Sequence, residues 1–171
     1  MQLLRGNPWP ELFGACRSEA FHLEVADSYA VADEWEPFRK YLDGEPDDFA
    51  WFDPWLELVK DTTGRGVAVK RTRVVTVPHT DYTRFSLAVT ALNIDAGEDI
   101  RYLARHQARQ VPTDDFWLLD DTRVVFNLVD GSGRAADGAA VTADAGIVEY
   151  CRQIKQRFWS LATPYREYIG R

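Results

Sequence analysis

Apolar positions recur along this chain with two periods, one typical of helices and one typical of strands. From Ala32 to Asp43, and again from Trp51 to Thr62, aromatic and aliphatic residues return every three or four positions, which places them on one helical face. From Val67 to Val77 the period is close to two and β-branched residues dominate, as in a strand. Both patterns in one short chain predict an α/β fold.

The remaining segments continue the mixture of helices and strands. We expect a short helix over residues 7–16, strands over 20–25, 100–103, 115–120 and 123–129, a helix after Thr80-Asp81, and a long helix that Thr142 opens and Thr163-Pro164 ends. The segment from Gly131 to Gly138 is the most loop-like part of the chain because it is rich in glycine.

Together these elements predict a single α/β domain over residues 1–171. Residues 1–63 form its mainly helical part, and residues 64–171 contribute the sheet and the C-terminal helix. We expect a mixed sheet of about five or six strands, with two N-terminal helices packed on it and the long C-terminal helix closing it. A chain of 171 residues is long enough to bury the core of one such domain.

Composition predicts a cytoplasmic protein without membrane association, cofactor or metal. No apolar stretch reaches the ~20 residues that a membrane-spanning helix needs, and the N-terminus lacks the apolar core of a signal peptide. Cys16 and Cys151 match no metal or redox spacing. His22, His79 and His106 are too scattered to indicate a metal site.

Charge is distributed unevenly along the chain. The net charge of −7 argues against direct binding of nucleic acid. From Glu19 to Asp61 there are 13 acidic and 3 basic residues, whereas from Thr62 to Arg109 there are 8 basic and 4 acidic ones. Two explanations are open: the acidic part folds over the basic strands, or the basic face is a binding surface.

A group of arginines is the strongest candidate for a binding surface. Strand alternation places Arg71 and Arg73 on one face, with Thr72 and Val74 on the other. Guanidinium groups suit the recognition of planar anions and carboxylates. If the neighbouring strands are adjacent, the candidate binding residues are Arg71, Arg73, Tyr82, Arg84, Arg101 and Arg105. The alternative is that these arginines pair internally with Glu34, Glu36, Glu98 or Asp120.

No complete catalytic signature is present. The serines lack the glycines of a nucleophile elbow. The residues that an enzyme would use are His106 together with the carboxylates Glu98, Asp115 and Asp120. In a chain with 27% charged residues, such carboxylates are better explained by solvation or by ion pairs at the surface.

Over nearly its full length the chain resembles an actinobacterial family of uncharacterised proteins. The resemblance lies in Gly64–Gly66, Arg71–Val75, Asp81–Phe85, Ala96–Leu103 and Asp115–Asp120. Genes of this family often stand beside genes for helix-turn-helix regulators. The resemblance therefore implies a protein partner of the helix-turn-helix class, and it implies no activity.

A second resemblance, at the level of the fold, is to one half of a phospholipase-D-like domain. It lies in the strand ending at Asp120-Asp121 and the helical pattern from Val148 to Pro164. The enzymes of that family need a histidine, a lysine two positions later and an aspartate five positions beyond. After His106 those positions hold Ala108 and Thr113. The resemblance thus implies a degenerate half, and a second imidazole would have to come from a partner in a homodimer.

The sequence favours a non-enzymatic regulatory or interaction module over an enzyme. Such a module would act with a helix-turn-helix partner or sense a small anionic ligand. The alternative is a small hydrolase or transferase, directed at phosphodiesters, that uses His106 and nearby carboxylates. A concave pocket with convergent titratable groups would favour the enzyme, and an open patch of arginines would favour the module.

Overall fold

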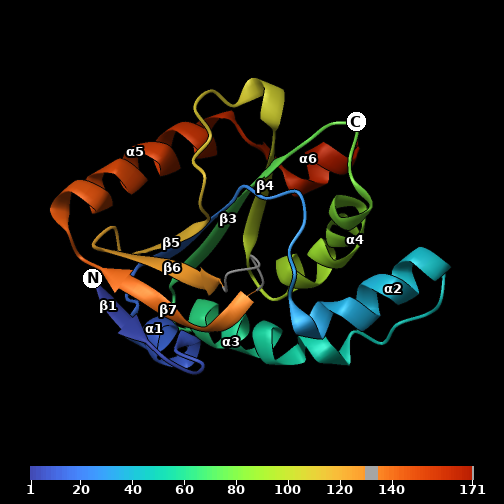
Figure 1. The fold of residues 1–171 in the computed structure, drawn as a ribbon, viewed down its shortest axis with the longest axis horizontal. Helices are drawn as coiled ribbons and strands as arrows, with labels where there is room; N and C mark the ends of the chain where they lie inside the picture. Colours follow the sequence, from blue (N-terminus) through green and yellow to red (C-terminus); the bar gives the residue numbers. More distant parts are fainter. Residues whose placement is uncertain (130–134, 171) are drawn as a thin grey trace.

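The computed structural model describes residues 1–129 and 135–170. They form an eight-stranded mixed sheet with helices on both faces (Figure 1). The strands are β1 (Gln2–Leu4), β2 (Glu19–Glu24), β3 (Ala68–Val75), β4 (Asp99–Ala104), β5 (Phe116–Leu119), β6 (Arg123–Val129), β7 (Ala135–Thr142) and β8 (Thr163–Pro164). The helices are α1 (Trp9–Ala15), α2 (Trp35–Asp43), α3 (Asp53–Gly64), α4 (Asp81–Asp95), α5 (Ala145–Leu161) and α6 (Tyr165–Ile169), with 3-10 turns η1 (Ala32–Glu34), η2 (Ala50–Phe52) and η3 (Arg105–Gln107).

The centre of the sheet is parallel and its flanks are antiparallel. The strand order is β1-β7-β6-β5-β2-β3-β4-β8. β2, β3 and β4 run parallel, with α2 and α3 in the first crossover and α4 in the second. In the register of β2 and β3, His22 lies beside Arg71 and Glu24 beside Arg73. The mixed α/β architecture in one domain, expected from the sequence, is confirmed.

Side-chain caps begin the two longest helices. The Thr80 hydroxyl accepts from the N–H of Thr83 at the start of α4, 3.1 Å away. The Asp144 carboxylate accepts from the N–H groups of Gly146 and Ile147 at the start of α5, both at 3.0 Å. Such caps satisfy amides that lack a partner within the helix. They fix where each helix starts over the sheet. Among the described helices, none has the length and apolar character needed to cross a membrane.

The two faces of the sheet are covered differently. One face packs against α5 through an apolar cluster that includes Leu23, Val74 and Phe158. The other face lies under α1, α3, α4 and α6, and its apolar clusters are interrupted by the side chains of Arg71 and Arg73. Figure 1 shows α5 on one side of the sheet and α3 on the opposite side. The polar interruption lies at the centre of the second face.

The sheet has eight strands where about five or six were expected. The additional strands are β1, β7 and β8. β7 covers residues 135–138 of the predicted loop, while residues 131–134 of that prediction lie outside the described residues. β7 reads AADGAAVT and has little strand propensity of its own. Its neighbours β6 and β1 supply the backbone pairing instead. The predicted helices over 32–43 and 51–62 and the long C-terminal helix are present.

We predict that Gly138→Ala destabilises the β1–β7 edge. Gly138 has φ +120°, and an added Cβ would lie 2.3 Å from the carbonyl oxygen of Leu4 in β1. Strain of this kind costs about 2 kcal/mol. Urea unfolding should show the loss, and hydrogen exchange should show lower protection of the β1 amides. Gly64→Ala is the control, because nothing lies within 4 Å of its added Cβ. Equal stability of the two variants would contradict the prediction.

Candidate functional site

A pocket of about 160 Å³ lies on the face of the sheet opposite α5. Its floor comes from β2 and β3, and α4 forms one side. The remaining walls come from the segment after β2, which includes η1, from the turn η2, from the residue before β5 and from β6. The lining residues are His22, Glu24, Tyr29, Val31, Glu34, Trp51, Phe52, Arg71, Arg73, Tyr82, Phe85, Ser86, Val89, Asn93, Asp115 and Asn127. A cavity of this size accommodates a molecule about as large as benzene.

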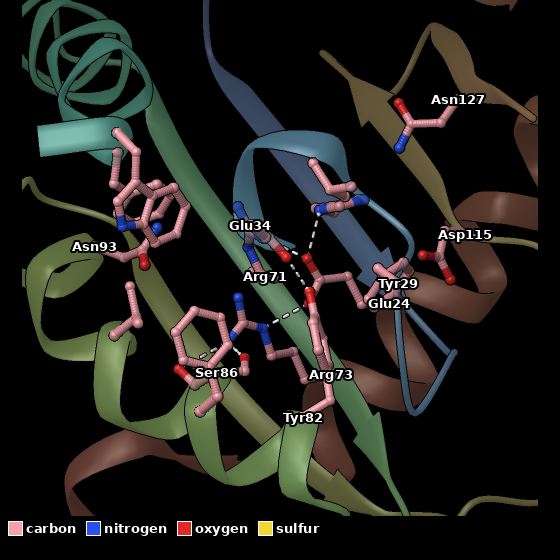
Figure 2. Close-up of a pocket in the computed structure, with 16 residues that line it drawn as sticks. Glu24, Tyr29, Glu34, Arg71, Arg73, Tyr82, Ser86, Asn93, Asp115 and Asn127 are labelled. Carbon is pink, nitrogen blue, oxygen red and sulfur yellow. Dashed lines mark hydrogen bonds and ion pairs between the residues drawn. The ribbon is translucent and has the colours of Figure 1, made fainter. Parts of the chain in front are cut away.

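A buried network of ion pairs forms the floor of the pocket. Glu24 accepts from Arg71 through one carboxylate oxygen, and through the other from Nε of Arg73 at 2.5 Å (Figure 2). Arg71 also donates from Nε to Glu98, 2.6 Å away. The second oxygen of Glu98 accepts from Asn93 on α4 at 2.8 Å. The network therefore links β2 and β3 to α4 and to the start of β4.

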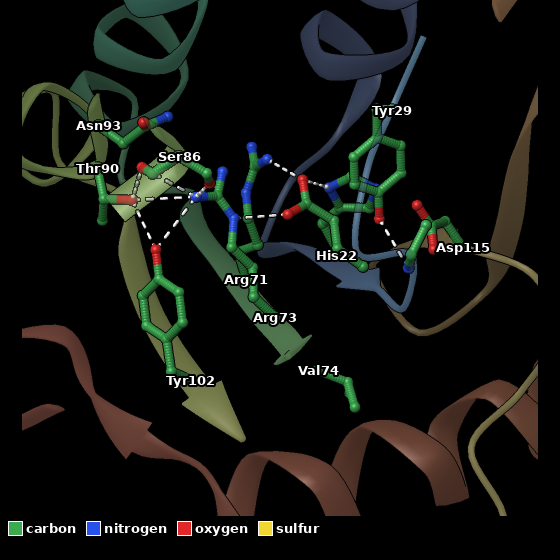
Figure 3. A network of polar contacts seen from close by, with 12 residues as sticks. His22, Tyr29, Arg71, Arg73, Val74, Ser86, Thr90, Asn93, Tyr102 and Asp115 are labelled. Atoms are coloured by element: carbon green, nitrogen blue, oxygen red, sulfur yellow. Dashed lines mark hydrogen bonds and ion pairs between the residues drawn. The ribbon is translucent and has the colours of Figure 1, made fainter. Parts of the chain in front are cut away.

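Arg73 extends the network towards α4 and β4. Its Nη1 donates to the Thr90 hydroxyl at 3.0 Å and to the Tyr102 hydroxyl at 3.1 Å, and it also contacts the Ser86 hydroxyl (Figure 3). Val74, the next residue, points to the other side of β3, towards α5 (Figure 3). Every contact of Arg73 thus lies on the pocket face of the sheet.

Electrostatics keeps these groups charged in spite of burial. Burial acts to raise the pKa of Glu24, but the charges of Arg71 and Arg73 outweigh it and lower the pKa to about 2. Burial likewise acts to lower the pKa of Arg71, and the charges of Glu24 and Glu98 outweigh it in the opposite direction. Arg71 and Arg73 are thus held in buried ion pairs with Glu24 and Glu98.

His22 lies at the edge of this network as a neutral group. Its ring stacks on Trp117 with a centroid separation of 4.2 Å, and the residue is 6% exposed. Burial lowers the pKa of His22 to about 3. Nδ1 lies 3.4 Å from the Glu24 carboxylate, yet neither ring nitrogen has a hydrogen-bond partner among the described residues. Buried polar atoms without partners are uncommon in native proteins.

Two further carboxyl groups, those of Asp115 and Glu34, line the pocket. Burial raises the pKa of Asp115 to about 6, and it also raises the pKa of Glu34. Asp115 accepts from the N–H of Val25 at 2.7 Å, and Glu34 accepts from the Tyr82 hydroxyl. Within residues 1–129 and 135–170, neither carboxyl forms an ion pair with lysine or arginine.

Aromatic rings form the apolar part of the wall. Tyr82 packs against Tyr29 and Phe85, with ring centroids 5.8 and 6.0 Å apart. Trp51 packs against Phe52 at 5.0 Å and also lies 6.3 Å from the ring of Phe85. Burial raises the pKa of Tyr29 and of Tyr82, so both hydroxyls keep their protons. The pocket thus combines neutral aromatic walls with carboxyl groups.

The structure divides the predicted arginine surface. Arg71, Arg73 and Tyr82 line the pocket, whereas Arg101 lies on the other face, because the register pairs it with Thr72 and not with either arginine of β3. There its guanidinium lies 3.9 Å from the ring centroid of Trp159.

The other two predicted arginines also lie away from the pocket. Arg84 is exposed and pairs with Asp81 at 2.6 Å. Arg105 donates to the carbonyl oxygen of Val25 and pairs with Asp27. The alternative to a binding surface was that the arginines pair internally. Arg71 does so: it pairs with Glu98, one of the expected partners, and with Glu24, which was not expected.

The residues of the alternative enzyme site are not brought together. His106 is exposed on η3 and does not line the pocket. Glu98 lies beneath the pocket, paired with Arg71, and Asp115 lines it. Asp120, beyond the other end of β5, caps the amides of Arg17 and Ser18 at 2.9 and 2.7 Å. Among the described residues, no group of three His, Cys, Asp or Glu side chains could hold a metal.

Sequence analysis missed the β2 side of the site. The signal was present: in Phe21-His22-Leu23-Glu24-Val25, polar and apolar residues alternate strictly. In an edge strand the polar face meets water. In β2 it lies in the pocket beside α4 and η2, because this strand lies in the middle of the sheet, and the sequence does not reveal that position.

Comparison with known proteins identifies the family and the fold. The family described as "Domain of unknown function (DUF6879)" matches residues 7–170, and the chain belongs to it. No curated protein matches the chain. Nuc of Salmonella typhimurium, a phospholipase D family member, is 13% identical with a TM-score of 0.57, and the match covers 92% of this chain and 88% of Nuc. The expected likeness to a phospholipase-D-like half is confirmed as a likeness of fold.

A second solved structure is that of TrmBL2, an archaeal chromatin protein. It is 15% identical with a TM-score of 0.49, and the match covers 95% of this chain and 52% of TrmBL2. This chain therefore spans about half the length of TrmBL2.

We predict that Glu24→Gln destabilises the protein by about 3 to 5 kcal/mol, because it leaves two buried guanidinium groups short of a carboxylate. Chemical unfolding measures the loss. Glu36→Gln is the control: it also breaks an ion pair with an arginine, Arg39, but in solvent. We expect little change there. A Glu24 variant as stable as the control would show that the network does not hold the fold.

We predict that Asp115→Asn stabilises the protein above pH 6. The folded state holds the Asp115 proton up to a pKa of about 6, against an ordinary value of 3.8, so the free energy of unfolding falls as the pH rises between these values. Asparagine keeps the acceptor for Val25 and avoids the charge. The gain should be on the order of 2 kcal/mol at pH 7.5 and vanish near pH 4.

Thermal unfolding at both pH values measures the gain, with Asp114→Asn, on an exposed neighbour, as the control. The same stability difference at pH 4 and pH 7.5 would contradict the proposed ionisation of Asp115.

Proposed function

We propose that this protein is a non-enzymatic binding module that senses a small molecule in the pocket between β2, β3 and α4. The observation that carries the proposal is the pocket itself, a concave site with aromatic walls and a few fixed polar groups. This combination is typical of small-molecule sites. The fold likeness to Nuc supplies no activity, because at 13% identity it extends only to the fold.

The chemistry of the lining residues supports binding over catalysis. Arg71, Arg73 and Glu24 are engaged with one another, and the Ser86 hydroxyl contacts Arg73. His22 is held neutral, and its pKa of about 3 is too low for a general base near pH 7. The pocket thus has groups that orient a ligand but lacks an activated nucleophile among the described residues.

A regulatory role would pass the bound state to a protein partner. The helix-turn-helix partner is still implied only by the resemblance to the actinobacterial family. Trp35 and Leu42 on α2 are 72% and 53% exposed, and α2 follows the segment that covers the pocket. We propose α2 as the element through which occupancy of the pocket reaches a partner.

A small hydrolase or transferase is the second candidate. One observation favours it: Asp115 lines the pocket with a pKa of about 6, which suits proton transfer near neutral pH. This site would use Asp115 without His106. Turnover of phosphodiester or ester substrates that Asp115→Asn abolishes would establish the enzyme and refute the module.

We predict that small fragments bind in the pocket and that Val31→Trp blocks them. Val31 lines the cavity from the segment before η1, so an indole at this position fills the space. Amide chemical shifts in a fragment screen should move at Ser86 and Asn93. Leu42→Trp, on exposed α2, is the control and should bind as the parent does. Shifts that map elsewhere, or that survive Val31→Trp, would contradict the pocket as the site.

A further inference from the structure

From the charge balance and hydrogen-bonding capacity of the pocket, we propose that its ligand is a small organic cation, with an ammonium group beside Asp115 and His22 and an apolar body against the aromatic wall. This inference rests on the proposed binding function. The arginines alone predict an anionic ligand, whereas the whole lining of the pocket favours a cationic one.

The first step is the charge balance. Arg71 and Arg73 are matched by the carboxylates of Glu24 and Glu98. An anion would have to displace one of these carboxylates, which lie 2.5 to 2.6 Å from guanidinium nitrogens in two of the three pairs. Breaking a buried pair of this kind is costly. The two arginines therefore do not offer a free anion site.

The second step is the surplus of acid. Asp115 and Glu34 line the same cavity and have no cationic partner among the described residues. Counted with the network, four carboxyl groups face two guanidinium groups. Burial raises the pKa of both unpaired carboxyls, because their charge is poorly solvated there. A cation in the pocket would relieve that cost, and an anion would increase it.

The third step is His22, an observation independent of the acids. It is buried, lines the cavity and leaves both ring nitrogens without hydrogen bonds. Placing the ring proton on Nδ1, the nitrogen 3.4 Å from Glu24, leaves Nε2 as an acceptor. His22 and Asp115 lie on the same side of Arg73 in Figure 3, with Tyr29 beside them. Both residues line the pocket, and an ammonium group has three N–H donors, enough for more than one acceptor.

The last step is the wall. Trp51, Phe52, Tyr82 and Phe85 line the cavity, and the electron-rich faces of such rings favour cations and apolar groups together. Asp115 and Asn93 lie at opposite ends of the lining residues in Figures 2 and 3. A ligand with its charge at the Asp115 end places its apolar body between these rings. The chemical class is a primary amine on a short apolar or aromatic group.

Three probes of similar size test the inference: benzylammonium, benzyl alcohol and benzoate. Each is titrated against the protein at pH 7.5 and followed by calorimetry and amide chemical shifts. We expect benzylammonium to bind at least tenfold more tightly than benzyl alcohol, and benzoate not to bind. Equal affinity for the alcohol, or tighter binding of benzoate, would contradict the inference that the ligand is a cation. In either case the pocket would still be a binding site.

Variants locate the charge. Asp115→Asn should weaken benzylammonium at least tenfold and leave benzyl alcohol unchanged, while the exposed Asp114→Asn should change neither. Glu34→Gln should give a smaller loss, with the exposed Asp33→Asn as its control. An Asp115 variant that binds benzylammonium like the parent would refute the inference. If none of the probes binds but neutral fragments occupy the pocket, only the inference of a cationic ligand is refuted. If no fragment binds either, the proposed binding function is refuted as well.

Discussion

Two arginines buried in the middle of a sheet impose the constraint on which this structure depends. Arg71 and Arg73 face helices and not water, so each needs a carboxylate within reach. Glu24 meets this need from β2, which fixes β2 beside β3 in one register. Glu98 meets it from the position just before β4. The order of the three parallel strands and the position of α4 are thus tied to one set of ion pairs.

This constraint gives the two faces of the sheet different roles. Under α5 the contacts are apolar, and this face supplies a conventional core. On the other face the ion pairs lie between apolar clusters and interrupt the second core. Burial of paired charges adds little net stability compared with hydrophobic packing. The buried ion pairs are therefore better explained as the support of a binding site than as a source of stability.

The elements that the sequence predicted well are those with strong local patterns. The helical stripes at 32–43 and 51–62 and the alternation from Val67 to Val77 need no knowledge of neighbours. β7 is different, because its small residues become a strand only through pairing with β6 and β1. Within the site, the shared face of Arg71 and Arg73 was predictable from alternation. The partner Glu24 was not, because strand order and register decide it.

The same register argument explains why the likeness of fold does not extend to the chemistry of the pocket. In the pocket His22 is neutral, with no free positive charge beside it among the described residues. Phosphate chemistry needs cationic groups free to hold the substrate. Here the carboxylates of Glu24 and Glu98 are paired with those cationic groups, and Asp115 and Glu34 add two more carboxyl groups to the pocket. The likeness to Nuc therefore extends to the fold, and the cationic ligand proposed above follows from the charge balance of the pocket.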